Sequence, residues 1–115
     1  MRAGTLFSQT VGTITNIVST SVGAPFGLTL LGMQVLNTNG SGVYGQVFNL
    51  QAGSVTVGTT VPLASIAFAT TSSTYVQFPD DGWFIGCKDG LSIAFTTTRS
   101  GGTAASVDCN IWEGN

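Results

Sequence analysis

The sequence has very few ionisable side chains. Charged residues make up 7% of its 115 residues, whereas about 25% is typical of soluble proteins. Residues 3–79 contain no Asp, Glu, Lys, Arg or His, and Thr, Ser, Asn, Gln and Gly stand where a surface usually carries charge. Uncharged faces can pair with other subunits without the free-energy cost of desolvating charges. The composition therefore indicates a structural protein that works in an assembly.

Histidine is absent, which removes the commonest general base and the commonest metal ligand. No nucleophile pattern such as Gly-x-Ser-x-Gly has a base candidate beside it. Asp80 and Asp81 form the only acidic pair, and we interpret them as turn residues that accept backbone N–H groups, with a bound ion as the alternative. We therefore predict that the protein is not an enzyme and has no catalytic residue, cofactor or metal site.

Only three basic residues are present, too few for the positive footprint of a nucleic-acid or anionic-membrane binder. The longest mostly apolar run, residues 24–36, is interrupted by Gly and polar residues and falls short of the ~18 residues of a membrane span. The first residues lack the continuous apolar core of a signal peptide. We expect a soluble protein made in a cytoplasm, with no nucleic-acid partner and no membrane.

The sequence contains two cysteines, Cys87 and Cys109. Two are too few for a disulfide scaffold or a zinc site. They could pair with each other, but because no export signal is visible we favour two buried thiols.

The pattern that is present is that of β-strands. Hydrophobic residues make up 43% and the net charge is −2, the opposite of a disordered chain. Helical periodicity is missing, period-two alternation is common, and Gly, Ser and Asn mark breaks about every 8 to 12 residues, as in a sandwich or barrel. The predicted strands cover roughly residues 11–19, 28–37, 43–50, 54–58, 63–69, 74–78, 82–87, 91–98 and 106–112.

These features predict an all-β fold, an antiparallel, jelly-roll-like β-sandwich with a single domain. We place the sandwich at residues 26–115 and assign residues 1–25 to an N-terminal segment or arm. Asn39-Gly40 is a two-residue turn signal and predicts a β-hairpin between the strands on either side of it.

The predicted strands 28–37 and 43–50 are apolar on both faces. One face of a strand in an antiparallel sandwich normally meets water, so these strands need a second cover. That cover could be the N-terminal segment or another subunit, and a homotrimer would provide it. The candidate interface residues are Leu31, Met33, Val35, Tyr44, Phe48, Leu50 and Trp112.

Four aromatic residues are also candidates for stacking on a sugar. Aromatic side chains are equally expected in a core or at a subunit interface, so both readings stay open. The four are Tyr44, Tyr75, Trp83 and Trp112.

The order of short motifs resembles a group of small β-rich proteins encoded among the virion genes of tailed bacteriophages. The pattern is VxNxxxxxVYxQxFN, then VTxGTTxPxxSI, an FPxxG turn and GLSIAxTTT. The matching residues are Val35-Leu36-Asn37, Val43-Tyr44, Gln46, Phe48-Asn49, Gly58-Thr59-Thr60, Pro62, Phe78-Pro79, Gly90-Leu91-Ser92-Ile93 and Thr96-Thr97-Thr98. The sequence around Cys87 departs from the pattern, and the first 25 residues have no clear counterpart in it.

This resemblance implies a head decoration (cement) protein located on the capsid exterior of the virion and synthesised in the host cytoplasm. Such proteins commonly form trimers, bind the major capsid protein and stabilise the head. The alternative is a tail, fibre or baseplate component, with glycans as its ligands.

Overall fold

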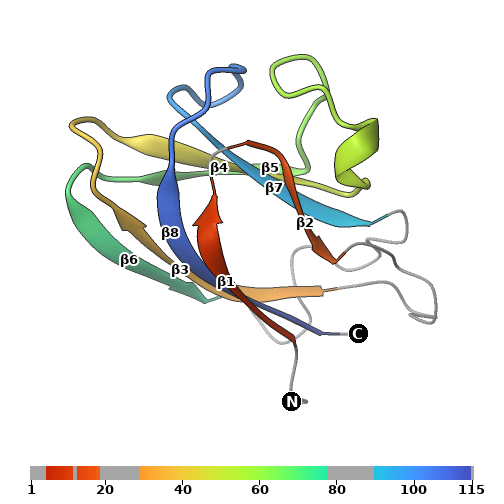
Figure 1. Cartoon of the computed structure of the whole chain (residues 1–115), viewed down its shortest axis with the longest axis horizontal. Coiled ribbons are helices and arrows are strands. Elements are labelled where there is room, and N and C mark those ends of the chain that lie inside the picture. Colours follow the sequence, from red (N-terminus) through yellow and green to blue (C-terminus); the bar gives the residue numbers. More distant parts are fainter. Residues whose placement is uncertain (1–4, 12, 19–28, 78–89, 115) are drawn as a thin grey trace.

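The computed structural model describes residues 5–11, 13–18, 29–77 and 90–114. These residues form eight strands and one short 3-10 helix, η1 (Figure 1). No helix among them is long and apolar enough to cross a membrane. The elements are β1 (Thr5–Val11), β2 (Thr15–Val18), β3 (Thr29–Asn37), β4 (Val43–Phe48), η1 (Ala52–Ser54), β5 (Ala64–Phe68), β6 (Ser72–Gln77), β7 (Leu91–Thr96) and β8 (Val107–Gly114).

The first four strands fold back along the last four. β1 pairs with β8, β2 with β7, β3 with β6 and β4 with β5, all antiparallel. Two further pairings, β3 with β8 and β4 with β7, complete the sheets. Sheet A has the order β1-β8-β3-β6 and sheet B the order β2-β7-β4-β5.

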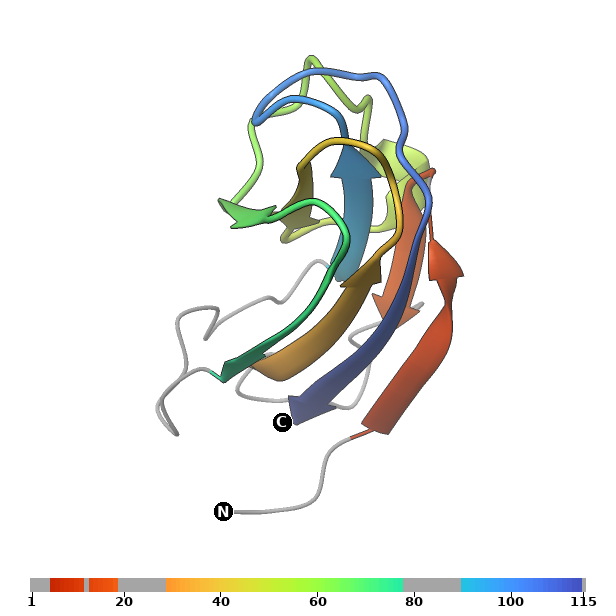
Figure 2. The ribbon, with the colours of Figure 1, turned by 90° about the vertical axis from the view of Figure 1, so that its left-hand side faces the viewer.

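This order is that of an eight-stranded jelly roll, in which the chain repeatedly crosses from one sheet to the other. The two sheets face each other as the layers of one sandwich (Figure 2). The prediction of an all-β, antiparallel, jelly-roll-like single domain is therefore confirmed.

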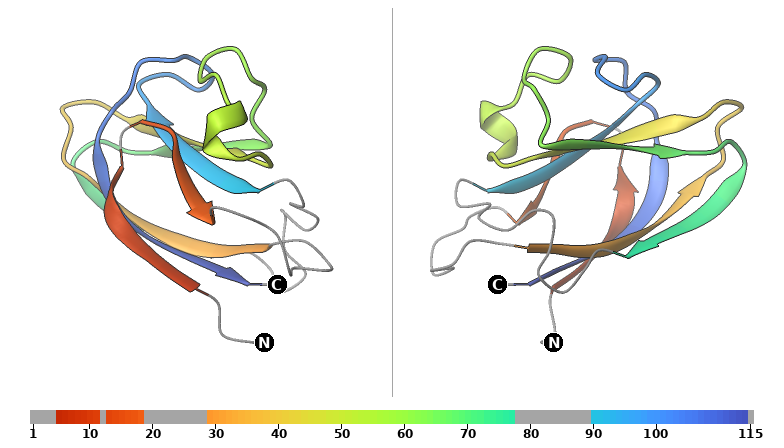
Figure 3. Two further views of the ribbon diagram at one scale, coloured as in Figure 1. Left: turned by 45° about the vertical axis from the view of Figure 1, so that its right-hand side comes forward. Right: turned by 180° about the vertical axis from the view of Figure 1, so that it is seen from behind.

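The beginning of the described chain lies inside this sandwich. The sequence predicts a segment or arm over residues 1–25, but β1 pairs with β8 from Thr5↔Glu113 to Val11↔Val107. β2 pairs with β7 in sheet B. Both strands supply backbone partners to a neighbour whose N–H and C=O groups need them. The described residues of this range therefore belong to the sandwich rather than to an arm (Figure 3).

The core lies between the two sheets. From sheet A, Met33 and Val35 of β3 enter it, and from sheet B the main contributors are Leu91, Ile93 and Phe95 of β7, all fully buried. The predicted strand 91–98 is present as β7, and its odd-numbered apolar residues point into the core with the period-two alternation of a β-strand.

Two predicted elements differ from the structure. Residues 54–58 are not a strand, since η1 and a turn occupy this region. Asn39-Gly40 does not form a hairpin turn: β3 and β4 lie in different sheets, and neither residue has the positive φ that a type I′ turn requires. The predicted strand 82–87 lies outside the described residues.

Candidate functional site

The two sheets have outer faces of different character. Side chains that alternate with the core residues point outward on each sheet. We call the outer side of sheet B the covered face; its described members are Tyr44, Gln46, Phe48, Ser92, Ala94 and Thr96. We call the outer side of sheet A the open face; its described members are Gln34, Leu36, Ser73, Tyr75, Asp108 and Asn110.

The covered face is hidden by two loops of the same chain. All six residues of β7 are buried, although only three belong to the core cluster. The β4–β5 loop, residues 49–63, is held by the hydroxyl of Ser92, which donates to the carbonyl of Leu50 at 2.9 Å. The β7–β8 loop, residues 97–106, lies beside it at the same end of the sandwich (Figures 1 and 3).

The two loops touch through their backbones at two glycines. A Cβ atom on Gly102 would lie 2.7 Å from the carbonyl oxygen of Val57, and one on Gly58 would lie 3.0 Å from Cα of Gly102. Gly58 also has a φ of +95°, which other residues rarely adopt. Any side chain at either position would force the loops apart.

Gln46 ties the β7–β8 loop to the sheet. Its Nε2 donates to Oγ1 of Thr96 at 2.8 Å and to the carbonyl of Gly101 at 2.9 Å. Thr96 gives its own hydroxyl proton to the carbonyl of Thr98 at 2.7 Å, so its oxygen can only accept from the amide. The orientation of the Gln46 amide is thereby fixed.

This orientation leaves Oε1 of Gln46 buried and without a hydrogen-bond partner among the described residues. An unsatisfied buried acceptor costs about 1–3 kcal/mol. The two hydrogen bonds donated by Nε2 therefore hold the loop, while Oε1 of the same side chain stays buried without a partner among the described residues.

Arg99 holds the same loop over the edge of sheet B. It is the only basic residue in the described part of the chain. Its guanidinium lies 5.2 Å from the ring centroid of Tyr44, a cation–π contact. Its Nη1 donates to the carbonyl of Ser65 at 3.1 Å, and Oγ of Ser65 donates to the carbonyl of Arg99 at 2.7 Å. These contacts link β4, β5 and the loop.

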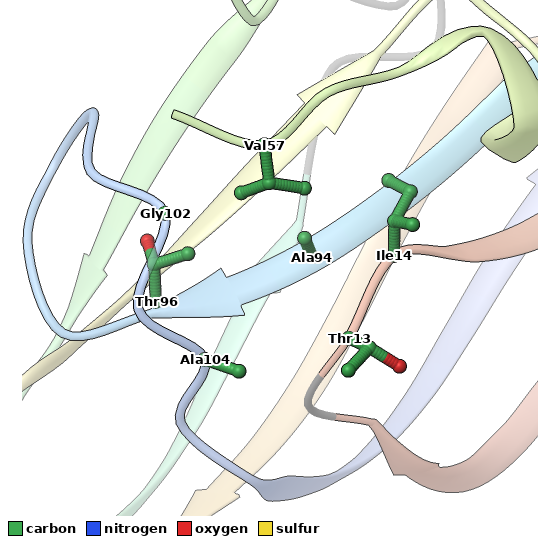
Figure 4. A pocket seen from close by; sticks show the side chains of 7 residues that line it. All are labelled: Thr13, Ile14, Val57, Ala94, Thr96, Gly102 and Ala104. Atoms are coloured by element: carbon green, nitrogen blue, oxygen red, sulfur yellow. The ribbon is translucent and has the colours of Figure 1, made fainter. Parts of the chain in front are cut away.

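A small pocket of about 170 Å³ opens between the β1–β2 connection, β7 and the two loops (Figure 4). Its described walls are mainly apolar, and no charged residue is among them, so they suit a small apolar group. The lining residues are Thr13, Ile14, Val57, Ala94, Thr96, Gly102 and Ala104.

The open face has no such loop cover over its described residues. Leu36 is 43% exposed and Tyr75 is 59% exposed, high values for large apolar side chains. Leu36 pairs with Ser73 and Gln34 with Tyr75, so Leu36 and Tyr75 are diagonal neighbours on β3 and β6. The open face is thus a mixed apolar and polar sheet surface, and Asp108, the register partner of Leu36, is the one charged side chain among its described members.

Three predicted interface residues are buried within the protomer rather than exposed for a partner. Met33 and Val35 are in the core, and Phe48 is 1% exposed beneath the covered face. Tyr44 and Leu50 are half-buried. The side chains of Leu31 and Trp112 lie outside the described part of the structure. The second cover that residues 43–50 need comes from the chain's own loops, which is why these apolar side chains do not face solvent.

The other residues named in the sequence analysis also differ in exposure. Tyr75 is exposed, whereas Cys109 is buried, with 4% of its surface accessible. Asp80, Asp81, Trp83 and Cys87 lie outside the described residues. Gln46 and Arg99 hold the β7–β8 loop in place, and the sequence analysis does not identify either as a site residue. Gln46 could have been identified, because it is a polar residue at an outward position of a strand that is apolar on both faces.

Comparison of the chain with protein-family models, with curated proteins and with solved structures found no match. Among residues 5–11, 13–18, 29–77 and 90–114, no group of three or more His, Cys, Asp or Glu side chains is placed to hold a metal ion. The open face, which exposes Leu36 and Tyr75, is the candidate site.

Proposed function

We propose that this protein is a capsid decoration (cement) protein of a tailed bacteriophage, which binds the outer capsid surface as a homotrimer and stabilises the head. Its partner in this role is the major capsid protein. The family resemblance of the motifs motivates the proposal, and the chemistry of the described surface supports it.

The observation that carries the proposal is the lack of charge on seven of the eight strands. β1 to β7 contain no charged residue, so β3 and β6 contribute only uncharged side chains to the open face. Burial of these β3 and β6 side chains against another protein requires no charge to be desolvated, and Asp108 of β8 is the one charged group among the described members of the open face. A monomeric protein more commonly carries charges there, because they keep it soluble and separate.

The open face also has anchors of the kind that interfaces use. Leu36 and Tyr75 supply apolar area, and Gln34, Ser73 and Asn110 supply hydrogen-bonding groups around them. Aromatic residues are enriched at interfaces and charged ones are depleted in their centres. On a capsid lattice, each modest contact is strengthened because many are made at once.

The direct test is reconstitution on heads that lack the protein. Purified protein is added to such heads, binding is measured by co-sedimentation, and the heads are then challenged with heat. We expect saturable binding and particles that rupture at a higher temperature. Heads that bind the protein but gain no heat resistance would contradict the cement role.

The open face is tested by Leu36→Asp, which adds a second carboxylate opposite Asp108 and should abolish head binding. Val61→Asp is the matched control, because Val61 is 86% exposed in the β4–β5 loop and is not part of the open face. If both variants bind heads like the unmodified protein, the open face is not the contact surface.

A tail, fibre or baseplate component that binds glycans is the second candidate. The observation in its favour is the exposed ring of Tyr75, whose register partner is Gln34 and whose next neighbour across β3 is Asn110. An aromatic ring with amide groups beside it suits a sugar, which has apolar and hydroxyl surfaces. Glycan-array binding that is lost in Tyr75→Ser, in a protein that does not bind heads, would favour this candidate.

A further inference from the structure

One network of asparagine side chains joins three connections at the end of the sandwich where β3 ends. We call it the loop tie. It links the β3–β4 connection to the β5–β6 connection and to the residue that precedes β8. Its hydrogen bonds run from Asn37 Nδ2 to the carbonyls of Ser41 and Ala69, from Asn39 N and Nδ2 to Asn37 Oδ1, from Asn39 Nδ2 to the carbonyl of Ser106, and from Thr70 Oγ1 to the carbonyl of Asn39.

The direction of every hydrogen bond in the loop tie is fixed. Asn37 is fully buried and gives both amide protons to backbone carbonyls, at 3.1 Å and 3.0 Å. If its amide were turned around, its oxygen would face those two carbonyls. The oxygen must therefore point to Asn39, where it accepts from the backbone N at 3.0 Å and from Nδ2 at 2.8 Å. The side chain at position 39 has to be a donor.

Asn39 is followed by Gly40, and this dipeptide is the most reactive context for asparagine deamidation, because glycine does not hinder attack by its own backbone nitrogen. No heavy atom would lie within 4 Å of a Cβ on Gly40, so the surroundings are open. The other asparagines are followed by Thr, Leu or Ile, except for Asn115, the last residue. The chain therefore has one asparagine in this context.

We infer that Asn39 is a site of spontaneous deamidation, and that the loop tie controls both its rate and its effect. The backbone nitrogen of Gly40 attacks Cγ of Asn39 and loses its proton; the bond from Cγ to Nδ2 breaks, and ammonia leaves. Water then opens the resulting succinimide at either carbonyl, which gives aspartate or isoaspartate. No oxidant or reductant is required.

The loop tie slows the first step, because Nδ2 of Asn39 is held by two acceptors, Asn37 Oδ1 and the carbonyl of Ser106, both at 2.8 Å. Reaction requires the side chain to leave them. After reaction, a carboxylate stands where Nδ2 stood, and it faces two acceptors without a proton to give. It also places a negative charge within residues 3–79, which otherwise have none. The modified loop tie cannot close again.

The modification is measured by ageing the intact purified protein in warm, mildly alkaline buffer. Peptide mass spectrometry with electron-based fragmentation identifies the mass increase and distinguishes aspartate from isoaspartate. We expect conversion at Asn39 over weeks, while Asn37 and Asn49 stay unchanged. Gly40→Ala is the matched variant; it has room for the new methyl group and should slow conversion by more than an order of magnitude. No conversion at Asn39, or equal rates in both proteins, would overturn the inference.

Control by the loop tie is tested with Thr70→Val, which removes the hydroxyl that donates to the carbonyl of Asn39 at 2.7 Å. Thr70 is exposed, so the variant should fold. We expect deamidation to accelerate severalfold; an unchanged rate would show that the loop tie does not control it.

The effect of the product is tested with Asn39→Asp against Thr38→Asp. Thr38 is exposed and takes no part in the loop tie, so its substitution adds the same charge nearby. We expect Asn39→Asp alone to lower the midpoint of thermal unfolding by several degrees. Equal midpoints would contradict the proposed effect.

Discussion

The rings of Phe68 and Phe95 pack with their centroids 6.1 Å apart and their planes tilted by 52°, against the bare backbone of Gly45. A Cβ atom at position 45 would lie 3.1 Å from Cε1 of Phe95 and 3.2 Å from Cε2 of Phe68. A methyl group therefore fits at this point in sheet B only if both rings move by a few tenths of an ångström. Interiors are close-packed, so one added carbon has to displace both rings.

We predict that Gly45→Ala lowers the free energy of unfolding by about 1–3 kcal/mol, the usual cost of overpacking a core. Urea denaturation followed by fluorescence measures it. Gly53→Ala is the control, because no atom lies within 4 Å of a Cβ at that position. A Gly45→Ala protein as stable as this control would show that the rings can move aside.

Gln46 allows a prediction about buried charge. In Gln46→Glu both donated hydrogen bonds are lost and a carboxyl group replaces an amide that is fully buried. We expect a loss of about 3 kcal/mol or more at neutral pH, since an unpaired buried charge is strongly destabilising. Gln46→Met keeps the length, removes the orphan oxygen and should cost less.

The pH dependence of the Gln46→Glu protein has a definite sign. Burial raises the pKa of the introduced carboxyl group in the folded state above its unfolded value of about 4.3. The destabilisation is then present above the unfolded pKa and disappears as pH falls below it. The difference in the free energy of unfolding between this variant and the unmodified protein, measured by urea denaturation, should shrink as the pH is lowered toward about 4. A difference that does not change with pH would mean that the carboxyl group is solvated.

Arg99 should determine how firmly the β7–β8 loop is held. Arg99→Ala removes the contact with the Tyr44 ring and the hydrogen bond to Ser65. Because the site is exposed, we expect only about 0.5–1 kcal/mol of lost stability, with faster hydrogen exchange in residues 97–106. Ser73→Ala, on the other sheet, should leave that exchange unchanged. Equal exchange in the Arg99→Ala protein would show that the remaining contacts, including those of Gln46, hold the loop without the guanidinium.

The oligomeric state is a further expected outcome. We predict a trimer at micromolar concentration by light scattering, with Leu36→Asp dissociating it and Val61→Asp leaving it intact. The charge introduced at Leu36 would have to be buried without a partner, which is unfavourable. A stable monomer of the unmodified chain would contradict the prediction.

Local patterns in the sequence predicted the strands but not what covers them. The strand that contains Leu91, Ile93 and Phe95 is predicted correctly, because period-two alternation depends only on the strand itself. The cover over Phe48 could not be predicted, because it depends on loops whose contacts, such as Gly58 with Gly102, join distant residues. The same cause explains why the sequence suggested a partner subunit there.

The turn at Asn39-Gly40 shows a second limit. The dipeptide suits a hairpin, but β3 and β4 belong to different sheets, and the residues instead serve the loop tie. Local turn preference cannot reveal a crossing between sheets, because the crossing is decided by which distant strands pair. Of the open face, Tyr75 was singled out in advance, whereas the exposure of Leu36 followed only from the register of β3 with β6 and β8.

The pairing of β1 with β8 has a consequence for biosynthesis. Among the described strands, β1 is the first to be synthesised, yet its partner β8 is made after all the others. The order of sheet A places β8 between β1 and β3, so neither can complete its hydrogen bonds on that side until translation has passed residue 107. Contacts between such distant segments slow folding, so sheet A should stay open until β8 has been made and then close in one late step.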